Sequence, residues 1–231
     1  MNHRAQEQDI MQNFDTPTTI SVVLDVPAGR IQLIAADRVD TTVEVLPADA
    51  GKSRDVQLAE ETTVTYTDGV LRIATPEPGN RLVGHSGSVE VTVQLPAGSQ
   101  VEARSASSEL RAVGTLGDLV VEGVYRQIKI DEAGSVRLSA VDGDVEVGRL
   151  NGPAEISTMR GDIRIGEAVR GTVVLSTQSG NISVDAAAGV SATLDAGTSL
   201  GRVSNALKND GATELDIRAT TVQGDITARS L

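Results

Sequence analysis

A short pattern recurs through the second half of the chain: a glycine, a polar residue, and then a β-branched residue that begins an alternation of apolar and polar residues. Five copies read "VDGDVEVGRL", "MRGDIRIGEA", "QSGNISVDAA", "SLGRVSNALK" and "VQGDITARSL". Their glycines, separated by steps of 18, 19, 21 and 23 residues, are Gly143, Gly161, Gly180, Gly201 and Gly224. Self-similarity at a fixed period of about 20 residues is typical of solenoid proteins, in which stacked repeats share one core.

A second alternating segment lies between successive copies of this pattern, for example "GSVRLSA" at 134–140 and "GTVVLST" at 171–177. Because side chains along a strand alternate between two faces, every second residue is expected to point inward. The predicted inward pairs are Leu119/Val121, Val136/Leu138, Val145/Val147, Ala154/Ile156, Ile163/Ile165, Val173/Leu175, Ile182/Val184 and Leu215/Ile217.

These repeats predict an all-β protein built mainly as a parallel β-solenoid, with two short strands in each coil of 18–23 residues. The composition favours such a fold, because the chain has no Trp and only 1% aromatic residues. Ordinary globular cores use aromatic side chains for bulk, whereas Val, Ile, Leu and Ala suit thin, regularly stacked layers. One coil cannot bury its own apolar face, so several must stack.

The N-terminal part of the chain also reads as β structure, but without the tight repeat. Thr67-Asp68-Gly69 predicts a hairpin turn between two alternating runs. We expect this part to cap the first coil, because an open β-edge invites aggregation. The predicted strands are 19–26, 30–36, 40–46, 62–67, 69–75 and 88–95, with polar loops at 47–60 and 76–88. The predicted organisation is a flexible tail at 1–12, an N-terminal β cap at 13–104 and solenoid repeats at 105–231, the last two in one continuous domain.

The tripeptide Arg160-Gly161-Asp162 has the sequence of a cell-attachment signal, but its neighbours form the same pattern without the arginine. Glycine permits a positive φ at a turn, and Asp or Asn can hydrogen-bond nearby backbone. We therefore interpret all five repeat glycines as structural turns. An alternative is a calcium-binding ladder formed by Asp144, Asp162, Asn181 and Asp225. Calcium prefers six to eight oxygen ligands, and one carboxylate per coil is few, so we predict neither a metal nor a cofactor.

Two kinds of enzyme are alternatives to a binding role. Paired carboxylates on neighbouring coils would suit a carbohydrate-active β-helix enzyme, although the chain has few aromatic residues to stack on sugars. The segment "GHSGS" places Ser86 in a partial nucleophile elbow, but Ser88 replaces the last glycine and a β fold lacks the strand-to-helix turn. The sequence therefore predicts no catalytic residues and a non-enzymatic protein.

The net charge of −12 and the lack of a basic cluster exclude nucleic acid and anionic membrane as expected partners. Outward residues such as Glu109, Glu122, Glu146 and Glu155 predict an acidic, solubilising face that favours a basic partner. The last segment, "GDITARSL", ends inside a repeat, so we expect an open C-terminal coil that binds a protein partner or a second copy. Without an apolar signal region or a run of about 20 apolar residues, the chain is expected to be cytoplasmic.

The chain resembles the DUF4097 family of β-strand-repeat proteins, also labelled adhesins or toastrack proteins. The resemblance rests on the glycine-aspartate repeat, the paired "VPAG" and "LPAG" turns, and "TSLGRVSNAL" before the last "GDIT". The segment beginning "FDTPTTISVVLDVPAG" resembles the soluble actinobacterial members. The resemblance runs from about residue 13 to the end and implies a β-solenoid or toastrack fold. It also implies a scaffold, or a role near envelope-stress sensing, and supplies no catalytic residue. We therefore expect a non-enzymatic scaffold or protein-interaction module, with a calcium-dependent adhesin-like module and a carbohydrate-active enzyme as alternatives.

Overall fold

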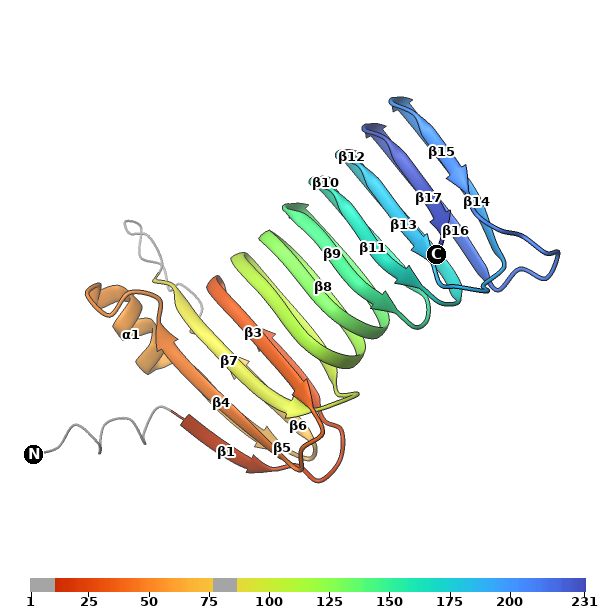
Figure 1. Ribbon diagram of the computed structural model, residues 1–231. Coiled ribbons are helices and arrows are strands. Elements are labelled where there is room, and N and C mark those ends of the chain that lie inside the picture. The colour runs from red at the N-terminus through yellow and green to blue at the C-terminus, as the bar shows by residue number, and fades with distance from the viewer. Residues whose placement is uncertain (1–10, 77–86) are drawn as a thin grey trace, which may run out of the picture.

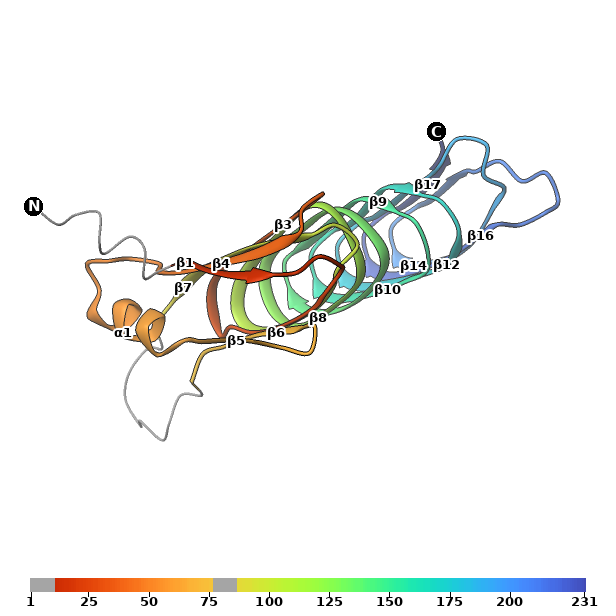
Figure 2. The same cartoon turned by 90° about the horizontal axis from the view of Figure 1, so that it is seen from below.

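The computed structural model describes residues 11–76 and 87–231, in which seventeen strands form one hydrogen-bonded sheet system and α1 (Ser53–Glu61) is the single helix. The strands follow one another along a long axis as coils, each with one strand in either of two stacked layers (Figures 1 and 2). The prediction of an all-β protein is confirmed. Within these described residues, no helix is long and apolar enough to cross a bilayer. Ser86 lies outside them.

The two layers, here called face A and face B, have their strands in matching order along the axis (Figure 2). Face A contains, in spatial order, β5 (Thr63–Thr67), β6 (Val70–Ala74), β2 (Ser21–Asp25), turns of β8 (Gln100–Asp142), β10 (Ala154–Arg160), β12 (Gly171–Ser179), β16 (Leu215–Gln223) and β14 (Ala192–Leu200). Face B contains β1 (Met11–Asp15), β4 (Asp40–Pro47), β7 (Val89–Pro96), β3 (Ala28–Ala36), turns of β8, β9 (Asp144–Leu150), β11 (Ile163–Ala168), β13 (Ile182–Ala186), β17 (Ile226–Ser230) and β15 (Val203–Ala206).

The core lies between the two faces. Every residue of the predicted inward pairs is at most 5% exposed, so the period-two prediction of the core is confirmed. Equivalent residues of successive coils stack in register: on face B one such column contains Ile128, Val145, Ile163, Ile182 and Ile226. Each β-branched side chain therefore covers the one below it, which replaces the bulk that aromatic residues give to other cores.

The order of coils in space differs from their order in the sequence at both ends of the molecule. The last coil of the chain, β16–β17, lies between β12–β13 and β14–β15. Likewise the first coil, β2–β3, lies between β6–β7 and β8. The prediction of an open C-terminal coil is therefore wrong, because the C-terminal strands have a neighbour on each side. The free edge at this end of the molecule belongs to β14 and β15.

The described strands up to β9 follow the sequence prediction closely, with three differences. Residues 100–142 form one strand of 43 residues that curls through several coils, where separate short strands were expected (Figure 2). The strand β1 starts at Met11, inside the predicted tail. Helix α1 occupies most of the predicted loop at 47–60. It has only nine residues, of which Leu58 and Ala59 pack against the core, too few apolar positions for a helical period to be recognised.

Candidate functional site

The predicted turn residues form one column at the corner that leads from face A to face B. The Oδ1 atom of Asp144 accepts the backbone N–H of Asp162 at 2.8 Å, and Oδ1 of Asp162 accepts that of Asn181 at 2.7 Å. Asn181 and Asp225 continue the series, each accepting a backbone N–H at 2.9 Å, the last from Arg202. We call these four acceptors the Asx ladder. Each side chain satisfies the corner amide of the next coil.

The glycine before each ladder position is required for two reasons. Gly161 and Gly224 have φ of 133° and 148°, which disfavours any side chain. A Cβ on Gly161 would also lie 2.2 Å from the carbonyl oxygen of Gly143, and one on Gly224 only 1.9 Å from that of Gly180. Gly201, in the outermost coil, lies in the same column, with its Cβ position 1.9 Å from the Gly224 carbonyl oxygen. At these corners, the backbone of one coil therefore packs directly on the backbone of the next and leaves no room for a Cβ atom.

A threonine three residues before Gly180, Gly201 and Gly224 completes the corner, and its role could not be predicted from the sequence. The buried hydroxyl of Thr177 donates to the carbonyl of Gly161 at 3.2 Å, and that of Thr221 to Gly180 at 3.0 Å. Thr198 donates in the same way to Gly224, at 3.0 Å. The recurring T-x-x-G spacing was visible in the sequence, but an inward hydroxyl has no obvious use until the stacked carbonyls are known.

The ladder accounts for Asp and Asn at these positions without a cation. One carboxylate or amide oxygen of each residue is already bound to a backbone N–H. Within residues 11–76 and 87–231, no three His, Asp or Glu side chains are grouped so that they could hold a metal ion. In Asp144, Asp162, Asn181 and Asp225, one side-chain oxygen each is thus used in a hydrogen bond between coils.

The outward acidic residues lie beside cations of neighbouring coils. Glu109 is 3.6 Å from Arg30, Glu146 is 3.2 Å from Lys129, and Glu155 has Arg137 at 3.7 Å. Glu122 similarly lies 3.4 Å from the Arg104 guanidinium. Exposed pairs of this kind contribute about 0–1 kcal/mol each. They neutralise the predicted acidic face locally, which weakens the reason to expect a basic partner there.

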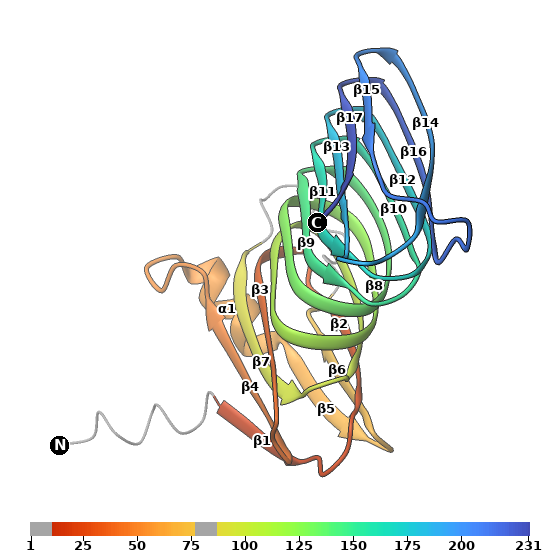
Figure 3. The same ribbon diagram turned by 45° about the vertical axis from the view of Figure 1, so that its right-hand side comes forward.

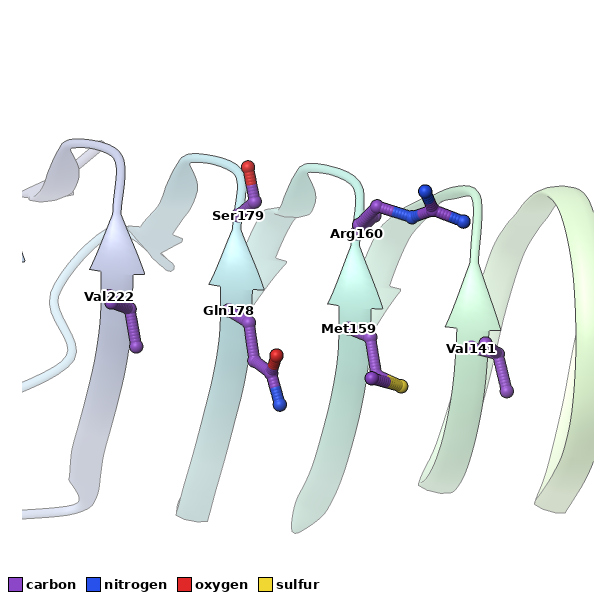
Figure 4. A pocket seen from close by; sticks show the side chains of 6 residues that line it. All are labelled: Val141, Met159, Arg160, Gln178, Ser179 and Val222. Carbon is purple, nitrogen blue, oxygen red and sulfur yellow. The ribbon is translucent and has the colours of Figure 1, made fainter.

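A shallow hollow of about 430 Å³ lies on the outer side of face A, next to the corner column (Figure 4). Its lining comes from the ends of four neighbouring strands, β8, β10, β12 and β16, and consists of Val141, Met159, Arg160, Gln178, Ser179 and Val222. Val141, Met159 and Val222 are 42%, 47% and 53% exposed, although they are large and apolar. The Arg160 guanidinium is 3.0 Å from the Asp142 carboxylate, which neutralises the rim. We call this hollow the outer groove.

The edge coil β14–β15 differs from all the coils behind it, and we call it the free end. Val203 continues the column of β-branched core residues but is 46% exposed, whereas Ile226 behind it is 1% exposed. Asn205 stands at the next inward position, aligned with Ala228 and exposed. Arg202 replaces the Asp or Asn of the corner, so the Asx ladder has no acceptor on this coil. At the free end, core positions are therefore exposed, and the coil has no Asp or Asn to accept a hydrogen bond from a further corner.

Comparison with known proteins identifies the fold. A "putative adhesin" of known structure from Bacteroides fragilis is 16% identical with a TM-score of 0.53, and the match covers 95% of this chain and 96% of that chain. A "putative cell adhesion protein" from Clostridium sporogenes is 11% identical with a TM-score of 0.39, over 96% and 99% of the two chains. No curated protein matches the chain. The family model described as Toastrack DUF4097 matches residues 19–230, nearly the whole sequence. This protein therefore belongs to the Toastrack DUF4097 family.

Proposed function

We propose that the protein is a non-enzymatic scaffold that holds a partner protein in the outer groove. The observation that carries this proposal is a row across four neighbouring strands of face A, in which the exposed Val141, Met159 and Val222 side chains are joined by Gln178 between the last two. A contiguous exposed apolar patch rimmed by polar residues is typical of an interaction site. The coils behind it hold the row rigidly, because each strand is hydrogen-bonded on both sides.

The chemistry of the groove defines the partner. Its lining combines the apolar Val141, Met159 and Val222 with the Gln178 amide, and the Met159 thioether can adapt to different shapes. Its charged rim is the closed Arg160–Asp142 pair. The neighbouring outward row on the same strands is small and flat, formed by Ser139, Ser157, Ser176 and Thr220. Such a surface suits a partner segment that presents aliphatic side chains to the groove and its backbone to the hydroxyl row.

The proposal extends to the N-terminal strands, which we assign as a cap. On each face the first strand at that end is antiparallel to its neighbour: β5 to β6, and β1 to β4. The antiparallel strands β5 and β4 therefore interrupt the parallel series of coils on both faces at this end. Capping one end favours a module of fixed length, as a scaffold requires. The link to envelope stress implied by the family resemblance stays a prediction.

The groove is tested by placing a photo-activated cross-linking residue at Gln178 in the full chain, expressed in its source cells. We expect one cross-linked adduct of defined mass, identified by mass spectrometry. Met159→Glu should abolish the adduct, because a carboxylate cannot be buried against an aliphatic partner without a large desolvation cost. Val174→Glu is the matched control, since Val174 is exposed on the same face but does not line the groove.

An adduct that survives Met159→Glu as fully as it survives Val174→Glu would overturn the groove as the binding site. The absence of any adduct at Gln178 would do the same. Both variants carry outward substitutions, so their thermal unfolding should match that of the unmodified chain, and circular dichroism checks this before cross-linking.

A further inference from the structure

The free end has an unpaired backbone edge on both faces. Within the described residues, β14 pairs only with β16, and β15 only with β17. An uncovered strand edge presents N–H and C=O groups that pair readily with another strand. Leu200 and Val203, at 68% and 46% exposed, add apolar surface beside this edge. The free end is thus built to receive a further strand, and its local chemistry decides in which direction that strand runs.

Addition of a parallel strand, which would continue the solenoid, is unfavourable at this end. At each corner of the Asx ladder, an Asp or Asn oxygen accepts the backbone N–H of the next coil, whereas Arg202 offers no such acceptor. A further parallel coil would therefore bury a corner amide without a partner, which is unfavourable. It would also stack its apolar core on the polar Asn205 side chain. The free end therefore disfavours head-to-tail growth.

An antiparallel strand does not need the corner acceptor that Arg202 lacks, because it pairs with the backbone groups of β14 and β15. Two copies related by a two-fold axis across the free end would run β14 against β14, and β15 against β15, in opposite directions. A two-fold interface of this kind uses the same surface on both copies and closes the assembly at two. The same chain already uses antiparallel pairing at its other end, where β5 meets β6.

The charges of the free end are complementary in a two-fold, antiparallel arrangement of two copies. Arg202 lies in the corner between β14 and β15, and the loop 207–214 between β15 and β16 extends from the opposite end of these strands (Figures 1 and 3). That loop carries the exposed acidic residues Asp210 and Glu214. In residues 11–76 and 87–231, no ion pair uses Arg202, Asp210 or Glu214. A two-fold rotation brings each Arg202 to the acidic loop of the other copy.

We infer that the free end binds a second copy of this chain in a closed, antiparallel end-to-end dimer, with Arg202 of each copy against Asp210 and Glu214 of the other. The dimer leaves the outer groove of each copy open on face A. The C-terminal halves of the two copies, which carry the grooves, then meet end to end at the middle of the assembly. The two N-terminal strand caps lie at its outer ends.

The experiment is light scattering coupled to size exclusion on the full chain, over a hundredfold range of concentration. We expect a monomer–dimer equilibrium with no larger species. Arg202→Glu should raise the dimer dissociation constant at least tenfold, because like charges would then meet. The fold should survive, since the ladder bond at this position uses the backbone N–H and not the side chain. Arg72→Glu makes the same charge change on β6, at the opposite end, and should leave the dimer unchanged.

Reversing the loop charges in the Arg202→Glu background, by Asp210→Arg with Glu214→Arg, should restore the dimer to within a few fold of the original dissociation constant. A monomer at every concentration would overturn the inference, as would species that grow beyond a dimer. A dimer that Arg202→Glu leaves intact, or one that the loop reversal fails to restore, would show that this charge pairing does not hold the two copies together.

Discussion

The two ends of this solenoid stop in different ways. At the N-terminal end, the outermost strand pairs of both faces are antiparallel, and α1 lies alongside β4 and β7. At the other end, the parallel series continues to its last strand and only its side chains change. The first end differs from the middle of the solenoid in strand direction, and the second differs in its side chains. Within the described residues the outermost strands at both ends have one strand partner each, but only at the free end does the parallel series run up to that edge.

The core also thins toward the free end. On face A, one inward column runs from Leu138 through Ile156 and Leu175 to Ala219 and Ala196. On face B, the column that contains Ile165 and Val184 ends at Ala228 and Asn205. Smaller side chains bury less apolar surface, so each coil near the free end contributes less stability than one in the middle.

The largest expected effect is a difference between the middle and the free end of one core column. Ile182→Ala removes a side chain that is 1% exposed and should lower the free energy of unfolding by about 2–5 kcal/mol. Val203→Ala, in the same column, should lower it by less than about 1 kcal/mol, because Val203 is already half uncovered. Urea titration followed by circular dichroism measures both. Equal losses would mean that the free end is as well packed as the middle.

A smaller difference in stability is expected between alanine substitutions at a stacked corner and at a positive-φ turn without close neighbours. Gly161→Ala should cost about 2–3 kcal/mol, because it combines backbone strain with a Cβ placed on the Gly143 carbonyl. Gly211→Ala should cost about 1 kcal/mol, since Gly211 also has a positive φ but nothing lies within 4 Å of its Cβ position. Thermal unfolding compares the two. If Gly211→Ala proves the more harmful, close stacking is not what the corner requires.

The Asx ladder itself predicts an effect near 1 kcal/mol. Asp162→Ala removes the acceptor of the Asn181 backbone N–H and should destabilise the chain by about 0.5–1.5 kcal/mol. Asp162→Asn keeps an acceptor oxygen and should be nearly neutral, with or without calcium in the buffer. A large loss for Asp162→Asn, accompanied by calcium-dependent melting of the unmodified chain, would instead favour a metal role for the ladder carboxylates.

The smallest prediction concerns the N-terminal end and its pH dependence. Arg38 donates two hydrogen bonds to the Asp40 carboxylate, at 3.0 and 2.9 Å, and these lower the pKa of Asp40 below its ordinary 3.8. A lowered folded-state pKa adds stability above the unfolded pKa and loses it as the pH falls through the folded one. The stability difference between the original chain and Asp40→Asn should therefore be present at pH 7 and vanish well below pH 3.8. A difference that does not change with pH would rule out this ionisation.

Much of the fold could be predicted from the sequence because period-two alternation depends on local residues alone. Val145 and Ile163 point inward in any arrangement of coils, so their burial followed directly. The order of the coils could not be predicted, because β16 carries the same alternation as β12 and β14 and fits equally well beside either. The outer groove could not be predicted for a related reason. Val141, Met159 and Val222 are far apart in the sequence, and only the strand register brings them into one row.

The corner shows the same limit at the level of single residues. The glycines were identified from their spacing and their tolerance of positive φ, and the Asp and Asn beside them from turn chemistry. That these side chains bond the next coil rather than their own turn depends on stacking, which no local pattern records. Arg202 is the clearest case, since in the sequence it is one degenerate position of a repeat. In the structure it marks the end of the ladder.

The measurement that tests this account most directly is amide hydrogen exchange of the last two strands in sheet order on face B. It is made on the Arg202→Glu variant, so that a dimer does not protect the free end. The inserted strand β17 has a neighbour on each side, so the amides of Ile226 to Ala228 should exchange more slowly than those of Val203 to Asn205 in β15. Exchange in the opposite order would place the C-terminal strand at the open edge and contradict the account of the free end.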